Sequence, residues 1–229
     1  MHPPNVRFPV IIFDFDGVIA DSFSVAFDVQ RMICPHLTER EYRARFDRNI
    51  NDWRGERRKH SRTCPGNIDF HTEYIPRFQR SVRLVPGIAQ VIKTLGARYP
   101  LVIISSTPSD LILKFAVRER IMKYFREIMG NDVSTRKVDK IRLLLSQYKV
   151  VPENCILVTD TLGDIREAER AGVRSIGVSW GFQSPDTLAQ GRPFRIARKP
   201  QDLVSAIEDY FSREPFRTNA RQAGSLRKL

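Results

Sequence analysis

Short, nearly uninterrupted apolar runs separated by helical patterns constrain the fold of this 229-residue chain more than any other feature. Three of these runs are VIIFD (10–14), LVIIS (101–105) and CILVTD (155–160). They are short for helices, and continuous apolar residues are typical of parallel strands that are buried on both faces. After the second run, TPSDLILKFAVRERIMKYF (107–125) has apolar residues at helical spacing. This alternation indicates βαβ units and a parallel sheet.

Other segments continue this alternation of strands and helices. Strands are expected at 126–130, 174–180 and 194–197, and helices at 88–99, 138–148, 165–172 and 201–211. The sequence therefore predicts an α/β fold whose Rossmann-like three-layer core, with a parallel sheet, is formed by residues 1–21 and 86–211.

Residues 22–85 interrupt the alternation of strands and helices, since they are rich in arginine and carry helical patches rather than strands. We expect them to form a small α-helical cap inserted after the first strand. The Pro-Gly turn in VPGI (85–88) marks the return to the core. Residues 212–229 are expected to be a basic, disordered tail.

The net charge of +12 is concentrated in two of these segments. Residues 22–85 hold 13 Lys and Arg against 8 Asp and Glu, and residues 212–229 hold 5 against 1. A solvated face and a basic tail would explain this excess of positive charge. The other explanation is an anionic partner, either a phosphorylated metabolite or a nucleic acid.

The composition also bears on location. No apolar stretch approaches the roughly 18 residues of a membrane span, and the N-terminal residues lack the features of a signal peptide. Three widely spaced cysteines (Cys34, Cys64 and Cys155) do not suggest a disulfide framework, so we expect a cytoplasmic protein without membrane partners.

Polar residues end the three runs quoted first: Asp14, Ser105 and Asp160. In an open parallel sheet, ligands bind beyond the carboxyl ends of the strands, so these side chains should converge on one crevice. Asp16 can face the same crevice if the backbone stays extended, and Gly17 permits a tight turn after it.

With Asp160 and Asp164 opposite Asp14 and Asp16, three or four carboxylates would share this crevice. Such a cluster repels itself unless a cation is present, and hard oxygen ligands favour Mg²⁺. Attack by Asp14 on the phosphorus of a substrate would form an aspartyl-phosphate and divide hydrolysis into two easier steps.

The motifs resemble those of a known family. DFDGVIADS (14–22) resembles the first motif of the haloacid dehalogenase superfamily in its phosphatase branch, and LVIISS (101–106) and ILVTDTLGD (156–164) match later motifs in order. The segments VPENCILVTDTLGDIREAERAG (151–172) and VSWGF (178–182) are similar to those of phosphoglycolate-phosphatase-like members. The resemblance covers residues of roughly 8–211.

The resemblance implies a role for each matching residue. Asp14 would be the nucleophile, Asp16 the general acid and then the general base, and Ser105 a hydrogen-bond partner of the phosphoryl group. Mg²⁺ would be held by Asp14, the backbone carbonyl of Asp16 and Asp160, with Asp164 acting through a bound water.

A lysine should neutralise Asp14 and the transferring phosphoryl group, and either Lys137 or Lys140 could supply it. Lys137 lies 23 residues before Asp160, a spacing that fits family members, so we favour it. Lys140 is then expected on the exposed face of the following helix.

Two positions depart from the family pattern: Val18 stands where many members have threonine, and Thr159 where glycine usually precedes the acidic residue. The presence of Asp16 argues against the dehalogenase branch. Ser106 and Arg54 are candidate substrate-binding residues, and the arginines of the expected cap suggest a leaving group with additional negative charge.

The same residues and the cysteines and histidines also allow interpretations other than a phosphatase site. A calcium loop that begins at Asp14 would need glutamate where Val25 stands. Asp164 could simply cap a helix. A zinc site is also conceivable, although its residues lack a settled zinc spacing: Cys34, His36, His60, Cys64 and His71.

The sequence therefore predicts a Mg²⁺-dependent phosphatase that hydrolyses a small phosphorylated metabolite through an aspartyl-phosphate. A phosphosugar mutase of the same fold and a nucleic-acid-associated phosphatase that acts on polynucleotide ends are the alternatives. The sequence does not predict the physiological substrate or the oligomeric state.

Overall fold

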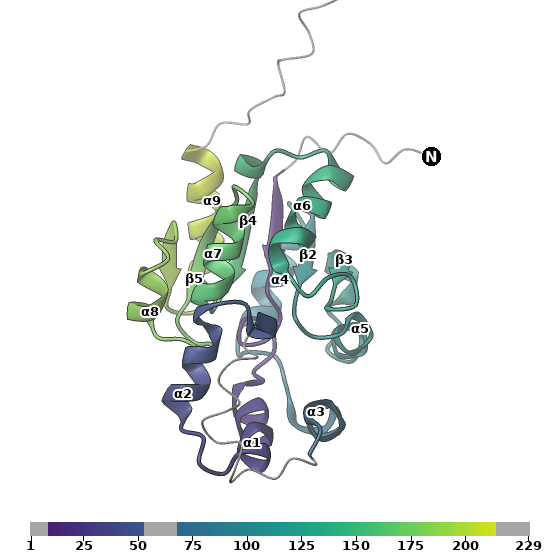
Figure 1. Cartoon of the computed structure of the whole chain (residues 1–229). Helices are drawn as coiled ribbons and strands as arrows, with labels where there is room; N and C mark the ends of the chain where they lie inside the picture. Colours follow the sequence, from purple (N-terminus) through teal and green to yellow (C-terminus); the bar gives the residue numbers. More distant parts are fainter. Residues whose placement is uncertain (1–8, 53–67, 214–229) are drawn as a thin grey trace, which may run out of the picture.

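A six-stranded parallel sheet forms the centre of the computed structural model, which describes residues 9–52 and 68–213 (Figure 1). The strand order is β3-β2-β1-β4-β5-β6, and every neighbouring pair is parallel. The strands are β1 (Val10–Phe13), β2 (Leu101–Ile104), β3 (Phe125–Met129), β4 (Cys155–Thr159), β5 (Arg174–Val178) and β6 (Arg195–Ala197). The predicted α/β class is confirmed.

Helices cover both faces of the sheet, which makes three layers (Figure 1). Ile11 and Phe13 of β1 belong to an apolar cluster with residues of α4, α5 and α9, whereas Val10 and Ile12 belong to a second cluster with α6 and α7. Successive side chains of a strand point to opposite faces, so β1 is apolar throughout because both faces are covered. These helices are α4 (Ile88–Gly96), α5 (Ser109–Arg118), α6 (Lys137–Tyr148), α7 (Leu162–Arg170), α8 (Pro185–Ala189) and α9 (Asp202–Arg213).

The strand register aligns the carboxyl ends of the three central strands. Phe13, the last residue of β1, is paired with Ile103 of β2 on one side and with Val158 of β4 on the other. The residues that follow these strands therefore meet at one edge of the sheet.

The chain between β1 and α4 lies at that same edge (Figure 1). Its described elements are α1 (Phe23–Ile33), α2 (Glu39–Ala44), η1 (Arg45–Asp47), η2 (Ile50–Asp52) and α3 (Phe70–Ser81). Helices α1 and α3 pack against each other, while the segment after α2 contacts the core directly: a Cβ at Gly163 of α7 would lie 2.5 Å from the carbonyl oxygen of Arg48. That residues 22–85 form a separate cap and residues 212–229 a separate tail remains a prediction.

Two helices differ from the expected pattern. The helical pattern over 107–125 ends at Arg118, because Arg120 takes a left-handed conformation (φ 59°) and the Ile121 N–H donates to the Ala116 carbonyl. The short helix α2 was not predicted, although Thr38 and Glu41 form a capping box before it, with both reciprocal hydrogen bonds present.

Among the described residues, no helix combines the length and the apolar character needed to cross a membrane.

Candidate functional site

Asp14 follows β1 directly and is almost buried, with 5% of its surface exposed. Its N–H donates to the Val158 carbonyl (2.8 Å), and its Oδ1 accepts from the Phe15 N–H (2.7 Å). Gly17 then turns the chain at φ +71°, where a Cβ would lie 1.9 Å from Asp160 Oδ2. Only glycine fits that turn, and it brings the loop after β1 against the loop after β4.

Lys137 is the first residue of α6 and lies between two carboxylates, with 3% of its surface exposed. Its Nζ is 2.6 Å from Asp14 Oδ2 and 2.7 Å from Asp164 Oδ2. Burial alone would lower the pKa of Lys137, but the charges of Asp14 and Asp164 outweigh burial and raise that pKa. Lys137 is therefore a fixed cation beside Asp14.

Lys140 does not lie on the exposed face of α6, and that expectation was wrong. It is fully buried because it shares the inner face of the helix with Lys137 and Ile141. Its Nζ donates to the carbonyls of Ser105 (2.5 Å) and Gly130 (3.1 Å), so it joins the ends of β2 and β3 instead of a carboxylate. Burial, followed by the charge of Lys137, lowers the pKa of Lys140 to about 8.

Asp14, Asp160 and Asp164 each offer one carboxylate oxygen, and these oxygens lie within 4.8 Å of one another. Asp160 Oδ2 accepts from the Phe182 N–H (2.7 Å), whereas its Oδ1 is buried without a hydrogen-bond partner among the described residues. An unpaired buried carboxylate oxygen is costly, and burial raises the pKa of Asp160 to about 7. These residues could hold a metal ion.

Asp164 is the third residue of α7 and does not cap it. The cap is Thr161, whose side chain accepts from the Asp164 N–H. The Oδ2 of Asp164 accepts from Thr159 Oγ1 at 2.8 Å in addition to its contact with Lys137. Although burial alone would raise the pKa of Asp164, the charge of Lys137 and hydrogen bonds with Asp14, Lys137 and Thr161 lower it. Thr159, noted in the sequence only as a departure from glycine, thus supplies a donor to Asp164.

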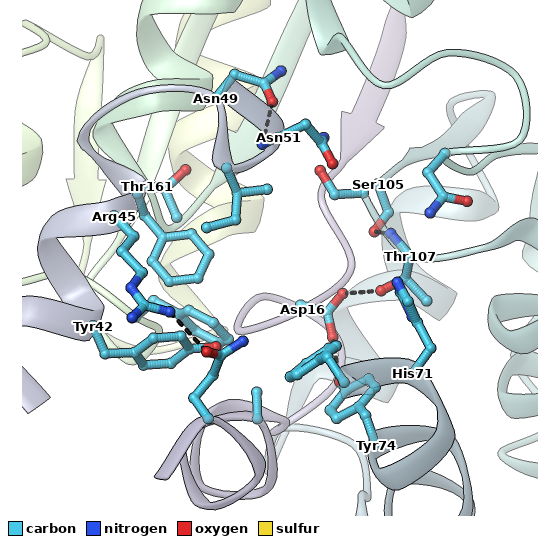
Figure 2. A pocket seen from close by; sticks show the side chains of 18 of the residues that line it. Asp16, Tyr42, Arg45, Asn49, Asn51, His71, Tyr74, Ser105, Thr107 and Thr161 are labelled. Atoms are coloured by element: carbon cyan, nitrogen blue, oxygen red, sulfur yellow. Dashed lines mark hydrogen bonds between the residues drawn. The ribbon is translucent and has the colours of Figure 1, made fainter. Parts of the chain in front are cut away.

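The Asp16 carboxylate is not part of the group formed by Asp14, Asp160 and Asp164, and three hydroxyl groups donate to it; Figure 2 shows the contact with Thr107. Thr107 donates to Oδ2 (2.6 Å), while Ser22 (2.7 Å) and Tyr74 (3.2 Å) donate to Oδ1. Any metal contact of Asp16 would then come from its backbone carbonyl, as the resemblance implies. Sequence reasoning missed all three hydroxyl partners.

Ser105 follows β2 and is buried. Its N–H donates to the Met129 carbonyl (3.0 Å), and its Oγ accepts from the Thr107 N–H (3.0 Å). Ser105 and Ser106 line a cavity of about 710 Å³ together with Asp14, Asp16, Lys137, Asp160 and Asp164. All of the predicted site residues that the structure describes therefore border one cavity.

Residues from the segment between β1 and α4 also form part of the wall of this cavity, among them Tyr42, Arg45, Asn49, Asn51 and His71 (Figure 2). The Asn49 side chain donates to buried Glu167 (2.6 Å) and to the Thr135 carbonyl (3.1 Å), which fixes this wall to the core. Arg54, the predicted substrate-binding residue, lies outside the described residues.

The alternative metal sites gain no support within residues 9–52 and 68–213. The calcium loop needs a helix before Asp14, and a strand precedes it. In the described ranges, Asp14, Asp160 and Asp164 are the one group of His, Cys, Asp or Glu side chains that could hold a metal. His60 and Cys64 of the zinc hypothesis lie outside these ranges.

The raised pKa of Asp160 predicts how the stability of the metal-free protein depends on pH. Between its unfolded value of 3.8 and its folded value of about 7, the folded state holds more protons than the unfolded state. The free energy of unfolding should therefore fall as the pH rises through this window. Asp14 acts in the same direction, because burial raises its pKa as well.

Thermal unfolding with a chelator, from pH about 5 to about 8, measures this effect. Adding Mg²⁺ should raise the melting temperature more at pH 8 than at pH 5, since a cation replaces the bound protons. Asp160→Asn should flatten the pH dependence. A pH-independent melting temperature in the wild-type protein would contradict the prediction.

The chain is similar to known proteins in sequence and in fold. The family model of haloacid dehalogenase-like hydrolases matches residues 11–178. The chain is 22% identical over 217 residues to a phosphoglycolate phosphatase from Vibrio parahaemolyticus, covering 86% of this chain and 95% of that protein. It is 25% identical over 226 residues to pyrophosphatase PpaX from Listeria monocytogenes, covering 89% and 98%.

A solved structure from Agrobacterium tumefaciens, a haloacid dehalogenase-like protein of unknown function, superimposes with a TM-score of 0.74. It is 23% identical to this chain and covers 88% of it and 98% of its own length. This likeness shows the fold.

Proposed function

Because the chain belongs to the haloacid dehalogenase-like hydrolase family, we propose that it is a Mg²⁺-dependent phosphatase that hydrolyses a small phosphomonoester through an aspartyl-phosphate on Asp14. The observation that carries the proposal is the buried Asp14 carboxylate, 2.6 Å from Lys137 and within 4.8 Å of the carboxylate oxygens of Asp160 and Asp164. A nucleophile held among a cation and metal-binding carboxylates suits attack on an anionic phosphoryl group.

In the first step, a carboxylate oxygen of Asp14 forms a bond to phosphorus as the bond between phosphorus and the leaving oxygen breaks. The leaving oxygen takes the electron pair of that bond and a proton from the carboxyl group of Asp16. The Lys137 ammonium offsets the charge of the phosphoryl oxygens, and Ser105 donates a hydrogen bond to one of them.

In the second step, a water molecule attacks the phosphorus of the aspartyl-phosphate. Asp16, now ionised, takes a proton from that water, and Asp14 leaves as a carboxylate. Phosphate departs, and both aspartates return to their starting protonation states.

Asp14, Asp160, Asp164 and the backbone carbonyl of Asp16 would hold the Mg²⁺. All of these donors are oxygens, and the unpaired buried Oδ1 of Asp160 gives the set a position that a hard cation fits. When bound, the metal would polarise the phosphoryl group and offset the mutual repulsion of the carboxylates.

The substrate is proposed to be a small phosphorylated metabolite, since the relatives are named for phosphoglycolate and pyrophosphate hydrolysis. A phosphosugar mutase would use the same first step but return the phosphoryl group to a sugar instead of water. Analysis of the products distinguishes the two: a hydrolase releases phosphate, whereas a mutase converts a hexose phosphate into its isomer.

A screen of phosphorylated metabolites with Mg²⁺ tests the proposal. We expect equal amounts of phosphate and alcohol from at least one substrate, and a loss of at least about 100-fold with a chelator, because the metal contributes several kcal/mol to transition-state stabilisation. Restoring Mg²⁺ should restore activity. Phosphate release that is insensitive to chelation would contradict the proposal, as would complete inactivity across the panel.

A further inference from the structure

The carboxylate of Asp16 is held by three hydroxyl groups that come from three separate parts of the chain. Ser22 precedes α1, Tyr74 lies in α3, and Thr107 follows β2. Two donate to Oδ1 and one, Thr107, donates to Oδ2. Figure 2 shows the contact with Thr107. Thr107 lies in the loop after β2, and its N–H donates to Ser105 Oγ in the same loop. Among the described helices of the segment 22–85, α3 is the one that donates a hydrogen bond to Asp16, through Tyr74.

A row of aromatic rings fixes the position of Tyr74. Its ring stacks on Phe70 (4.9 Å between centroids, 18° between planes) and contacts Phe78 (5.5 Å) one turn further along α3. Phe78 in turn contacts Phe15 (5.9 Å) and Phe115 (5.6 Å). Phe15 is the residue between Asp14 and Asp16, so α3 is anchored on the same loop that carries the two aspartates.

The side chain of Tyr74 is 5% exposed and borders the cavity. An ordinary phenol is protonated near neutral pH, so the Tyr74 hydroxyl can donate to Asp16. Tyr42 also borders the cavity from the same segment, but no hydrogen bond joins its hydroxyl to Asp16 in the described structure.

We propose that Tyr74 is a positioning residue that orients Asp16 and stabilises the carboxylate formed when Asp16 gives its proton to the leaving oxygen. As the bond between phosphorus and that oxygen breaks, the oxygen takes the electron pair and the proton, and the hydroxyls of Tyr74, Thr107 and Ser22 donate to the new carboxylate. This inference rests on the proposed function and extends it to a residue of the inserted segment.

Leaving groups of different acidity reveal such a role. A 4-nitrophenolate ion leaves without a proton, whereas benzyl alcohol leaves only if its oxygen is protonated, and the two phosphate esters are of similar size. If Tyr74 acts through Asp16, then Tyr74→Phe should lower kcat/KM for benzyl phosphate by about tenfold or more. The loss for 4-nitrophenyl phosphate should be under about threefold. The phenylalanine ring retains the aromatic row, so folding should be preserved.

Two further variants sharpen the experiment. Thr107→Val removes another donor to the same carboxylate and should show the same selective loss. Tyr42→Phe removes a hydroxyl from the same cavity without touching Asp16, and it should change kcat/KM for both esters to the same extent. Matching circular dichroism spectra and melting temperatures control for folding.

The inference is overturned if Tyr74→Phe lowers kcat/KM equally for the two esters, or not at all, while the wild-type protein hydrolyses both and Asp14→Asn does not. If the wild-type protein with Mg²⁺ hydrolyses neither ester nor any metabolite of the panel, the proposed function fails, and this inference fails with it. The two failures are therefore distinguishable.

Discussion

Replacing Asp14 with asparagine should lower phosphatase activity by at least about 10⁴-fold, because the amide is a poor nucleophile and the covalent route is lost. The substitution keeps the shape of the side chain, and the amide oxygen can still accept from the Phe15 N–H (2.7 Å in the native protein). Lys137 keeps its partner Asp164. The loss should therefore arise from chemistry rather than from unfolding.

Steady-state kinetics on the best substrate of the metabolite panel measure this effect, with Mg²⁺ at saturation. Asp110→Asn is a matched control, since Asp110 is exposed on α5 and pairs with exposed Lys114 at 3.2 Å. It should leave kcat/KM unchanged. Equal turnover by the wild-type protein and Asp14→Asn would exclude Asp14 as the nucleophile.

Replacing Lys137 with methionine should lower the free energy of unfolding of the metal-free protein by about 3–5 kcal/mol near neutral pH. Its Nζ contacts the carboxylates of buried Asp14 and of Asp164, which is 15% exposed, and the variant leaves both without their cation. Methionine matches the length of the lysine side chain, so a cavity contributes little. Because the lost cation also faces the proposed phosphoryl site, activity should fall by at least about 100-fold.

Urea unfolding with a chelator measures the stability, and Lys114→Met is the control. Lys114 is exposed and pairs with exposed Asp110 at 3.2 Å, so its replacement should change stability by no more than about 0.5 kcal/mol. Mg²⁺ should recover part of the stability lost in Lys137→Met, since it offsets the same carboxylate charges. Equal stabilities of Lys137→Met and the wild-type protein would contradict this account of the buried cluster.

The strands and the meeting point of Asp14, Ser105 and Asp160 could be predicted because their signal is local. Each strand is a short apolar run, and parallel pairing then places the following residues at one edge of the sheet. The preference for Lys137 over Lys140 depended on the resemblance, because the 23-residue spacing to Asp160 fits family members. Lys140 was expected on the exposed face of the helix, whereas both lysines are buried.

The surroundings of Asp16 could not be predicted in this way. Ser22, Tyr74 and Thr107 approach it from three segments, and only tertiary packing determines that their hydroxyls meet. Tyr74 also stands at helical spacing with Phe70 and Phe78, which in sequence indicates a core position. By contrast, the start of α2 has a local signal in the sequence, because Thr38 and Glu41 form a capping box.

Trapping of the covalent intermediate tests the central claim most directly. The protein is mixed with Mg²⁺ and substrate, quenched during turnover and treated with borohydride, which reduces an aspartyl-phosphate to homoserine. Peptide mass spectrometry then locates the reduced residue. We expect homoserine at position 14 in the wild-type protein, dependent on substrate and absent from Asp14→Asn. Reduction at another residue, or rapid phosphate release from a protein that never acquires homoserine, would contradict the account.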